Sequence, residues 1–246
     1  VFIGNYYFTS SKIIIFDIWG DYAHFKKPYT TTSPLTYSIP SRTALTGIIG
    51  AIMGIRKDKN NEDLNYSKCN LSIRIMNPIK KTIINQNLIN TKTAEKMSRM
   101  KSKGGRTQIR IENLKDVKYR IYVEIFSEKE HNDLLSRLKN HSPVFTPSLG
   151  ISENLANFSF IEEVEYKKEM GDIKLHSVLN IEKIQPQNVI FEEGKEYFVD
   201  TYSLEMQEDR EVLKYGEILI ERKGQEIAVR NIEYIALSNG ENIMWV

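Results

Sequence analysis

His24 is the residue of this sequence whose type and neighbours best suit acid–base chemistry, because Lys26 and Lys27 follow it closely. An imidazole can take the proton of an RNA 2′-hydroxyl, and a nearby ammonium can stabilise the charge of the phosphorane that forms. The same three side chains can also bind an RNA by stacking and hydrogen bonding, without cutting it. The residue types are compatible with both interpretations.

Aromatic side chains interleave with basic ones on either side of this histidine. Aromatic rings stack on unpaired bases, whereas basic groups contact phosphates, so the combination suits a nucleic acid better than a small metabolite. The alternative, which we expect to hold for a part of the rings, is that they cover a sheet. The residues concerned are Tyr22, Phe25, Tyr29, Tyr37, Lys26, Lys27 and Arg42.

A strand, a loop and a helix must position these residues. The β-branched and aromatic run Lys12–Trp19 predicts a buried strand that ends at Gly20. Three prolines and a Thr/Ser cluster predict an ordered, irregular loop over residues 22–40. Ser41 suits the N-cap of a helix, and the free N–H groups there could hold one phosphate together with Arg42. The apolar face of this helix comprises Leu45, Ile48, Ile49, Ile52 and Met53.

Small residues occupy the rest of the same helix. A glycine in a helix interior costs about 1 kcal/mol relative to alanine, so repeated glycines need a reason. Close approach of another backbone, from a strand or from an RNA, is the reason we expect. The small residues are Ala44, Gly47, Gly50, Ala51 and Gly54.

The net charge of +2 hides an asymmetry between the two halves of the chain. Residues 1–118 hold 20 Lys and Arg against 8 Asp and Glu, whereas residues 119–246 hold 14 against 24. A strongly basic half suggests a polyanionic partner, although two differently solvated faces of a neutral protein would give the same numbers. On the first interpretation the acidic half lies away from an RNA or faces a partner protein.

Residues 80–118, here called the basic arm, hold 11 Lys and Arg against 3 acidic residues. Strand-like flanks surround a tip at Lys101–Arg106 that is flexible by composition, which predicts a long hairpin. A solvated, disordered loop is the alternative. With the tip included, the candidate RNA-binding residues are Tyr22, His24, Lys26, Lys27, Tyr29, Tyr37, Ser41, Arg42, Thr43, Lys101, Lys103 and Arg106.

The remaining pattern predicts a mixed α+β protein with a β-rich C-terminal part. An amphipathic helix is expected at Glu128–Asn140, with His131 and His141 exposed, and a short helix at Ile151–Asn157. The expected strands are Leu71–Met76, Lys118–Phe126, Phe158–Tyr166, His176–Ile184, Tyr197–Leu204, Glu217–Glu221 and Ile227–Ile232.

Several classes of protein are disfavoured. The sequence contains no Walker A, dinucleotide-binding, zinc-protease or zinc-finger pattern, so we expect no cofactor and no metal site. The single cysteine, Cys69, excludes an internal disulfide framework and fits a reducing cytoplasm. No apolar run approaches ~18 residues, so no membrane span is expected.

Two motifs carry a resemblance to a known family. Phe16–Lys27, then Thr31–Pro40, then Arg42–Gly54 resemble the opening of the CRISPR-associated Cas Five family, in the form found in type I-B Cascade complexes. Pro147–Ala156 resembles a second motif of that family, a Leu-Gly-x-Ser-x-x-Leu-Ala turn. Together the motifs cover about a fifth of the chain, in the expected order.

The resemblance implies a ferredoxin-like RNA-recognition domain of the RAMP type at residues 1–170. It further implies a β-hairpin thumb inserted at about 78–118, where the basic arm falls, and a β-rich part at 171–246. The function implied is a non-catalytic subunit of a type I Cascade surveillance complex, acting in antiviral defence. It would hold the five-prime handle of the guide RNA and cap the backbone. The implied partners are the Cas Seven backbone, the large Cas Eight subunit and, through the assembled complex, target DNA.

Two other functions stay open. Some members of the family cut the repeat RNA with Tyr, Lys and His, so a metal-independent endoribonuclease is the main alternative. Tyr37, His24 and the lysines of the arm supply those residue types, but not at a spacing that matches. The other alternative is a scaffold protein whose basic arm binds an acidic partner, against which the aromatic–basic interleaving argues weakly.

Overall fold

A ferredoxin-like unit forms the body of the protein in this computed structural model, which describes residues 12–30, 33–56, 59–98, 105–207 and 209–246. Two helices follow the first and third strands of an antiparallel sheet whose strands lie in the order β5-β1-β4-β2. The predicted α+β, RAMP-type fold is therefore confirmed. The elements are β1 (Lys12–Ala23), α1 (Arg42–Met53), β2 (Cys69–Ile75), β4 (Arg106–Ile125), α4 (Glu128–Lys139) and β5 (Asn157–Leu175).

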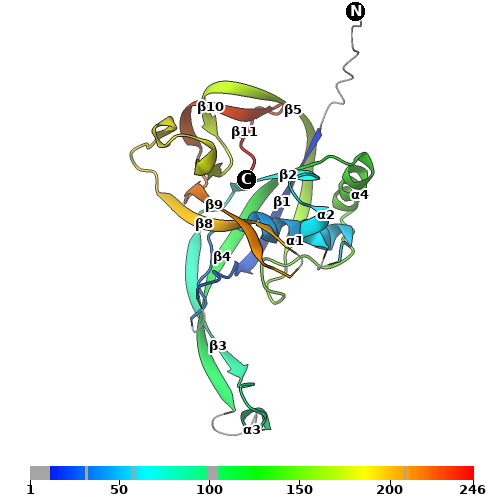
Figure 1. Cartoon of the computed structure of the whole chain (residues 1–246), viewed down its shortest axis with the longest axis vertical. Coiled ribbons are helices and arrows are strands. Elements are labelled where there is room, and N and C mark those ends of the chain that lie inside the picture. The colour runs from blue at the N-terminus through cyan, green and yellow to red at the C-terminus, as the bar shows by residue number, and fades with distance from the viewer. Residues whose placement is uncertain (1–11, 31–32, 57–58, 99–104, 208) are drawn as a thin grey trace, which may run out of the picture.

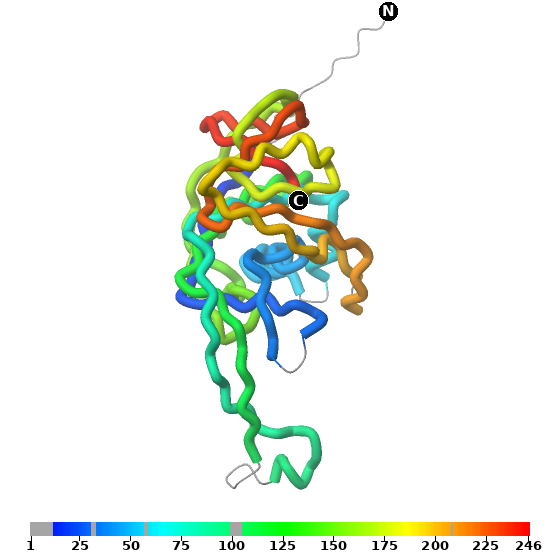
Figure 2. The backbone as a smooth tube through the Cα atoms, turned by 90° about the vertical axis from the view of Figure 1, so that its left-hand side faces the viewer, coloured from blue at the N-terminus to red at the C-terminus, as the bar shows by residue number. Residues whose placement is uncertain are grey.

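The predicted hairpin is present between β2 and α4. Strand β3 (Lys80–Ile89) pairs antiparallel with the first half of β4, from Lys80 opposite Lys115 to Ile89 opposite Arg106. A short helix, α3 (Ala94–Ser98), follows β3 near the far end. Figures 1 and 2 show this arm extending from one end of the body, opposite the C-terminal strands. Lys101 and Lys103 of the predicted tip lie outside the described residues.

The C-terminal part consists mainly of strands, as predicted. Strand β10 pairs with the far half of β5 and thereby extends the main sheet, while β6, β9 and β8 form a smaller one. The expected domain boundary at 170/171 falls inside β5, so the sheet continues across it. The elements are α2 (Asn60–Asp63) in the N-terminal half, then β6 (Leu179–Asn180), β7 (Val189–Ile190), β8 (Tyr197–Met206), β9 (Val212–Glu221), β10 (Ile227–Leu237) and β11 (Asn242–Ile243), with 3₁₀ turns at Ile181–Lys183 and Pro186–Asn188.

The core lies on both faces of the sheet. On one face, Ile14, Phe16 and Ile18 of β1 pack with the apolar face of α1, with α4 and with residues of β8 and β9. On the other face, Ile13 and Ile15 pack with residues of β10 and β11. Burial on both sides explains why β1 is a nearly continuous apolar run rather than an alternating one.

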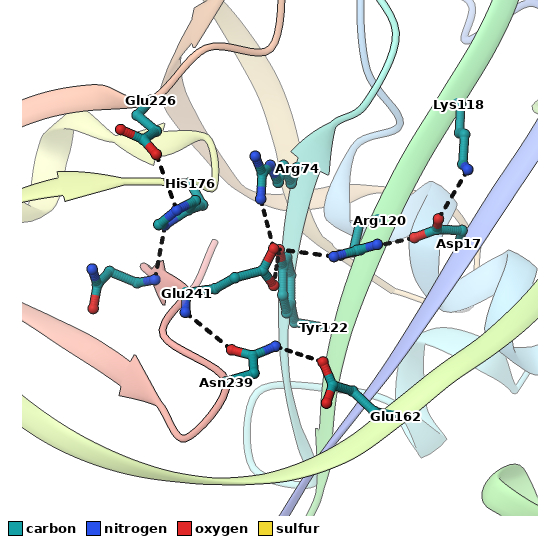
Figure 3. Close-up of polar contacts among 11 residues, drawn as sticks. Asp17, Arg74, Lys118, Arg120, Tyr122, Glu162, His176, Glu226, Asn239 and Glu241 are labelled. Carbon is teal, nitrogen blue, oxygen red and sulfur yellow. Dashed lines mark hydrogen bonds and ion pairs between the residues drawn. The ribbon is translucent and has the colours of Figure 1, made fainter.

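A charged network lies on the second face of the sheet and joins its first strands to the C-terminal turn (Figure 3). Glu241 accepts hydrogen bonds from Arg74 at 2.6 Å, from Arg120 at 3.1 Å and from the Tyr122 hydroxyl at 2.9 Å. Arg120 also donates to the buried Asp17 at 2.9 Å. Burial, together with the Glu241 carboxylate, raises the pKa of Tyr122.

Four local predictions were wrong. The strand expected at His176–Ile184 is reduced to the two residues of β6, which a 3₁₀ turn follows at Ile181–Lys183. Residues 151–157 form a turn with a bridge between Ser148 and Leu155, not a helix, because the backbone of this segment pairs with itself. Gly20 does not end the first strand, since β1 continues to Ala23. His131 is buried rather than exposed and its Nε2 lies 2.8 Å from Glu163 Oε1. His141 is exposed, as predicted.

No helix among the described residues is long and apolar enough to span a membrane. Within the same residues, no three His, Cys, Asp or Glu side chains are grouped closely enough to hold a metal ion.

Candidate nucleic-acid interface

The segment after β1 is ordered, as predicted, but returns on itself as a small hairpin rather than following an irregular path. A β-bridge joins Lys26 to Thr36, and the Tyr37 N–H donates to the Phe25 carbonyl at 2.8 Å. The Thr36 hydroxyl is buried and accepts from the Phe25 N–H at 2.9 Å. These bonds fix the positions of the basic and aromatic residues at its ends. Thr31 and Thr32, near its tip, lie outside the described residues.

Glu112, at the base of the basic arm, attaches this hairpin to the arm. Its carbonyl accepts from His24 Nδ1 at 2.7 Å, and its carboxylate accepts from the Thr36 N–H and from Lys81, each at 3.1 Å. The Glu112 N–H donates to the Pro34 carbonyl at 3.0 Å. The loop and the arm, which the sequence analysis treated as separate features, are thus one connected surface.

The two motifs that carry the family resemblance meet at His24. The His24 N–H donates to the Leu149 carbonyl at 3.0 Å. Gly150 has a φ of +94°, and a Cβ there would lie 2.0 Å from the His24 carbonyl oxygen. Only glycine accommodates both the left-handed conformation and this contact. The Leu149–Gly150 turn of the second motif therefore fixes the backbone of the first motif at His24.

Lys27 and Tyr37 connect the hairpin to the smaller sheet. The Lys27 ammonium forms an ion pair with Asp200 of β8, and the Tyr37 ring packs on Tyr202 with centroids 4.5 Å apart. Partial burial alone would lower the pKa of Lys27, but the hydrogen bonds and charges of Asp200 and Tyr29 outweigh it and raise that pKa. Burial, together with the Asp200 charge, raises the pKa of Tyr37 to about 12.

Helix α1 begins as predicted. Ser41 is the N-cap, and its hydroxyl accepts from the Ala44 N–H at 3.2 Å. The Thr43 hydroxyl lies 3.0 Å from Ser203 Oγ of β8. Arg42 instead points into the protein, where its Nη2 donates to the carbonyls of Leu64 and Cys69 at 3.2 and 3.0 Å.

These elements enclose a groove of about 730 Å³, here called the α1 groove. The hairpin after β1 forms one wall, the first two turns of α1 form the floor, and the β8–β9 hairpin forms the other wall. None of its described lining residues is acidic, which is notable in a chain with 32 Asp and Glu. The groove therefore suits an anion. Its lining includes His24, Lys26, Tyr37, Ser41, Thr43, Gly47, Asn60, Asn61, Gly150, Ser203, Arg210 and Tyr215.

The small residues of α1 have two different roles. Gly47 lies in open space, with no atom within 4 Å of the Cβ it lacks, and a second hollow of about 820 Å³ continues the groove past it to Ala51. At Gly50 the close neighbour is the Asn60 side chain, whose Oδ1 would lie 2.0 Å from a Cβ. The close approach of another protein backbone, which was expected at these glycines, is therefore absent at both among the described residues: Gly50 contacts a side chain, and Gly47 faces open space.

The predicted RNA-binding residues divide into three groups. Tyr22, Lys26, Tyr29 and Arg106 are exposed, and Ser41 and Thr43 reach the groove. Tyr37 lines the groove but is mostly buried, and Lys27 is paired with Asp200. His24 and Arg42 are each only 3% exposed and bonded to backbone carbonyls, which argues against a direct phosphate contact by either.

The contribution of the C-terminal half was missed. Ser203, Arg210 and Tyr215 line the groove, although the acidic half was expected to lie away from an RNA or to face a partner protein. Pairing between distant segments creates this wall, and the local pattern of β8 and β9 carries no sign of it. Arg210 and Tyr215 both fall between the expected strands Tyr197–Leu204 and Glu217–Glu221, where no element was predicted.

Comparison with known proteins agrees with the fold and the motifs. A sequence profile of the family described as CRISPR-associated protein (Cas_Cas5) matches residues 13–221. A CRISPR protein from Archaeoglobus fulgidus, known from a crystal structure, is 12% identical, with a TM-score of 0.52 over 94% of this chain and 97% of that one. A chain of a CRISPR RNA-guided surveillance complex is 12% identical, with a TM-score of 0.48 over 88% of this chain and 91% of that one.

No curated protein matches the sequence at a significant level. The profile match nevertheless covers most of the chain, including β1, α1, the arm and the smaller sheet. The chain therefore belongs to the CRISPR-associated protein family Cas_Cas5, which is the Cas Five family that its two motifs resemble.

Proposed function

We propose that this protein is a non-catalytic, RNA-binding subunit of a type I CRISPR surveillance complex, of the I-B kind, that holds the five-prime handle of the guide RNA. The observation that carries the proposal is the α1 groove, which has no acidic residue among its described lining residues and is joined through Glu112 to the basic arm. Lys26, Ser41 and Thr43 would contact the handle there, and Arg106 would contact RNA further along the arm.

The proposed partners follow from this role. The Cas Seven backbone and the large Cas Eight subunit would adjoin the protein in a cytoplasmic complex that acts in antiviral defence. Target DNA would be reached through the assembled complex.

The environment of His24 favours binding over cleavage. Its side chain is 97% buried, and Nδ1 already donates to the Glu112 carbonyl. A general base must reach the 2′-hydroxyl within ~3 Å, directly or through one water, and little of this ring is accessible. The endoribonuclease alternative is tested by incubating the protein with repeat RNA in EDTA. Product that forms there and disappears in a His24→Ala variant would establish the enzyme instead.

The proposal is tested by purifying the protein from cells that express its CRISPR repeat array and sequencing the RNA that copurifies. We expect guide RNAs whose five-prime ends carry a constant repeat-derived segment. A Lys26→Ala, Thr43→Val variant should recover less of this RNA, whereas Lys167→Ala, on an exposed part of β5 outside the groove, should recover as much as wild type. Recovery of random cellular RNA, or of none, would contradict the proposal.

A further inference from the structure

The β8–β9 hairpin is an unexpected part of the candidate interface, because it belongs to the acidic half of the chain. Its strands approach the start of α1, where Ser203 contacts Thr43, and the hairpin after β1, where Asp200 pairs with Lys27. Two of its side chains that line the α1 groove, Arg210 and Tyr215, take no part in these contacts.

We propose that this hairpin forms a nucleotide-binding wall, in which the Tyr215 ring stacks on one unstacked RNA base and Arg210 contacts an adjoining phosphate. The inference rests on the proposed function and adds the C-terminal half to its binding site. It also replaces the expectation that this half lies away from the RNA.

Tyr215 has the placement that base stacking requires. It lies opposite Ser203 in the β8–β9 ladder, lines the groove and is 48% exposed, so a ring face is available to a ligand. It is close enough to Tyr37 to influence the pKa of that residue, as is the exposed Tyr29 of the hairpin after β1. Exposed aromatic side chains that flank a basic groove are the usual platform for single-stranded nucleic acid.

Arg210 occupies a position that the backbone alone would not assign to arginine. It lies in the turn between β8 and β9, where its N–H donates to the Gln207 carbonyl at 3.0 Å. Its φ is +70°, in the left-handed region, where glycine or asparagine is the usual residue. An arginine at this turn brings a cation to the groove at some cost in backbone strain.

Three described acidic residues at the turn of the same hairpin do not line the groove. Glu205, Asp209 and Glu211 flank its turn, yet none of them is among the lining residues, which instead include Lys26 on one wall and Arg210 on the other. A groove with a cation on each wall and an exposed ring on the β8–β9 wall matches a nucleotide, which has both a phosphate and a π-face. Its volume of about 730 Å³ lies in the range of small-ligand sites.

The test is equilibrium binding of a fluorescein-labelled, handle-bearing single-stranded RNA, followed by anisotropy at several salt concentrations. Tyr215→Ala should weaken binding about fivefold or more, because one stacked base is lost, whereas Tyr215→Phe keeps the ring and should bind like wild type. Arg210→Gly fits the left-handed backbone and should reduce the slope of log K against log salt by about 0.7. Phe198→Ala and Arg230→Ala are the matched controls, since both residues are exposed on the C-terminal part outside the groove.

Each outcome separates the two proposals. If Tyr215→Ala and Arg210→Gly bind like their controls while Lys26→Ala is weakened, the hairpin inference is wrong and RNA binding by the groove stands. If wild type does not bind the RNA at all, the proposed function is wrong, and the hairpin inference fails with it. Thermal unfolding of each variant shows whether a loss of binding reflects a loss of folding, and Arg210→Gly keeps the test valid if Tyr215→Ala is unstable.

Discussion

Arg42 begins α1 directly after the N-cap, yet its side chain serves the protein rather than a ligand. The guanidinium bonds two backbone carbonyls and lies 3.9 Å from the centroid of the Tyr66 ring. Lys26, in contrast, is exposed on the wall of the groove that the hairpin after β1 forms. By residue type alone, Arg42 and Lys26 were equivalent candidates for binding RNA. Their different burial separates them.

This contrast predicts opposite effects for the two substitutions. Arg42→Ala should lower the free energy of unfolding by about 1–3 kcal/mol, because the carbonyls of Leu64 and Cys69 lose their donor, and should leave the salt dependence of RNA binding unchanged. Lys26→Ala should leave the unfolding free energy nearly unchanged and reduce the salt slope by about 0.7. Urea unfolding and RNA titrations measure both quantities. A reduced salt slope for a folded Arg42→Ala protein would reassign Arg42 to the RNA.

The raised pKa of Tyr37 predicts that the stability of the protein depends on pH. Burial raises its pKa from 10 to about 12, so the stabilisation that this residue supplies is fully present below pH 10 and is lost as the pH rises through about 12. The free energy of unfolding of wild type should therefore fall relative to that of Tyr37→Phe between these pH values. Urea unfolding of both proteins from pH 8 to 12 measures the difference. A constant difference would show that Tyr37 is not shielded from water.

At the scale of elements, the Leu149–Gly150 turn fixes the chain at the end of β1. Gly150→Ala should lower the free energy of unfolding by more than about 1–3 kcal/mol, because it combines a left-handed φ with a clash against the His24 carbonyl. Gly194→Ala is the matched control, since Gly194 has a φ of +83° but no atom within 4 Å of its missing Cβ. Equal losses in thermal and urea unfolding would show that the contact with His24 does not matter.

The elements differ in how far the sequence could predict them. The run Ile13–Phe16 is buried on both faces, so its position and type were clear, and Ser41 marked the start of α1 correctly. Strand β5 was predicted to end at Tyr166 but continues to Leu175, because polar residues there pair with β10 rather than with a local partner. Gly20 was taken for a strand end, although it is a point where Leu149 and Leu155 approach the strand.

At the scale of the whole molecule, Glu241 holds the C-terminal turn to the first strands (Figure 3). Its carboxylate is 12% exposed and serves Arg74, Arg120 and Tyr122. Glu241→Gln removes the negative charge that pairs with both guanidinium groups. It should lower the free energy of unfolding by about 3 kcal/mol. Glu226→Gln, which affects the more exposed pair with His176, should cost less than about 1 kcal/mol. Similar losses for the two variants would show that the network does not join the halves.

The candidate site as a whole was only partly predictable. The ordered loop after β1, the N-cap of α1 and the arm follow from local patterns of proline, serine and charge, whereas the pairing of that loop into a hairpin does not. The β8–β9 wall does not, because it depends on a smaller sheet folding back over α1 from more than 150 residues away, as Ser203 and Thr43 illustrate. The burial of His24 and Arg42 was not predictable either, because their partners are distant in sequence: Glu112 and Leu149 for His24, Leu64 and Cys69 for Arg42.

The most direct test of the central claim is the salt dependence of handle-RNA binding by the purified protein. Phosphate contacts release counterions, and each contributes about 0.7 to the slope of log K against log salt for single-stranded nucleic acid. Contacts from the groove and from Arg106 on the arm together predict a slope of about −1.5 or steeper, reduced by a Lys26→Ala substitution. Binding that is insensitive to salt, or the same slope in wild type and Lys26→Ala, would contradict the claim that the α1 groove binds the guide RNA.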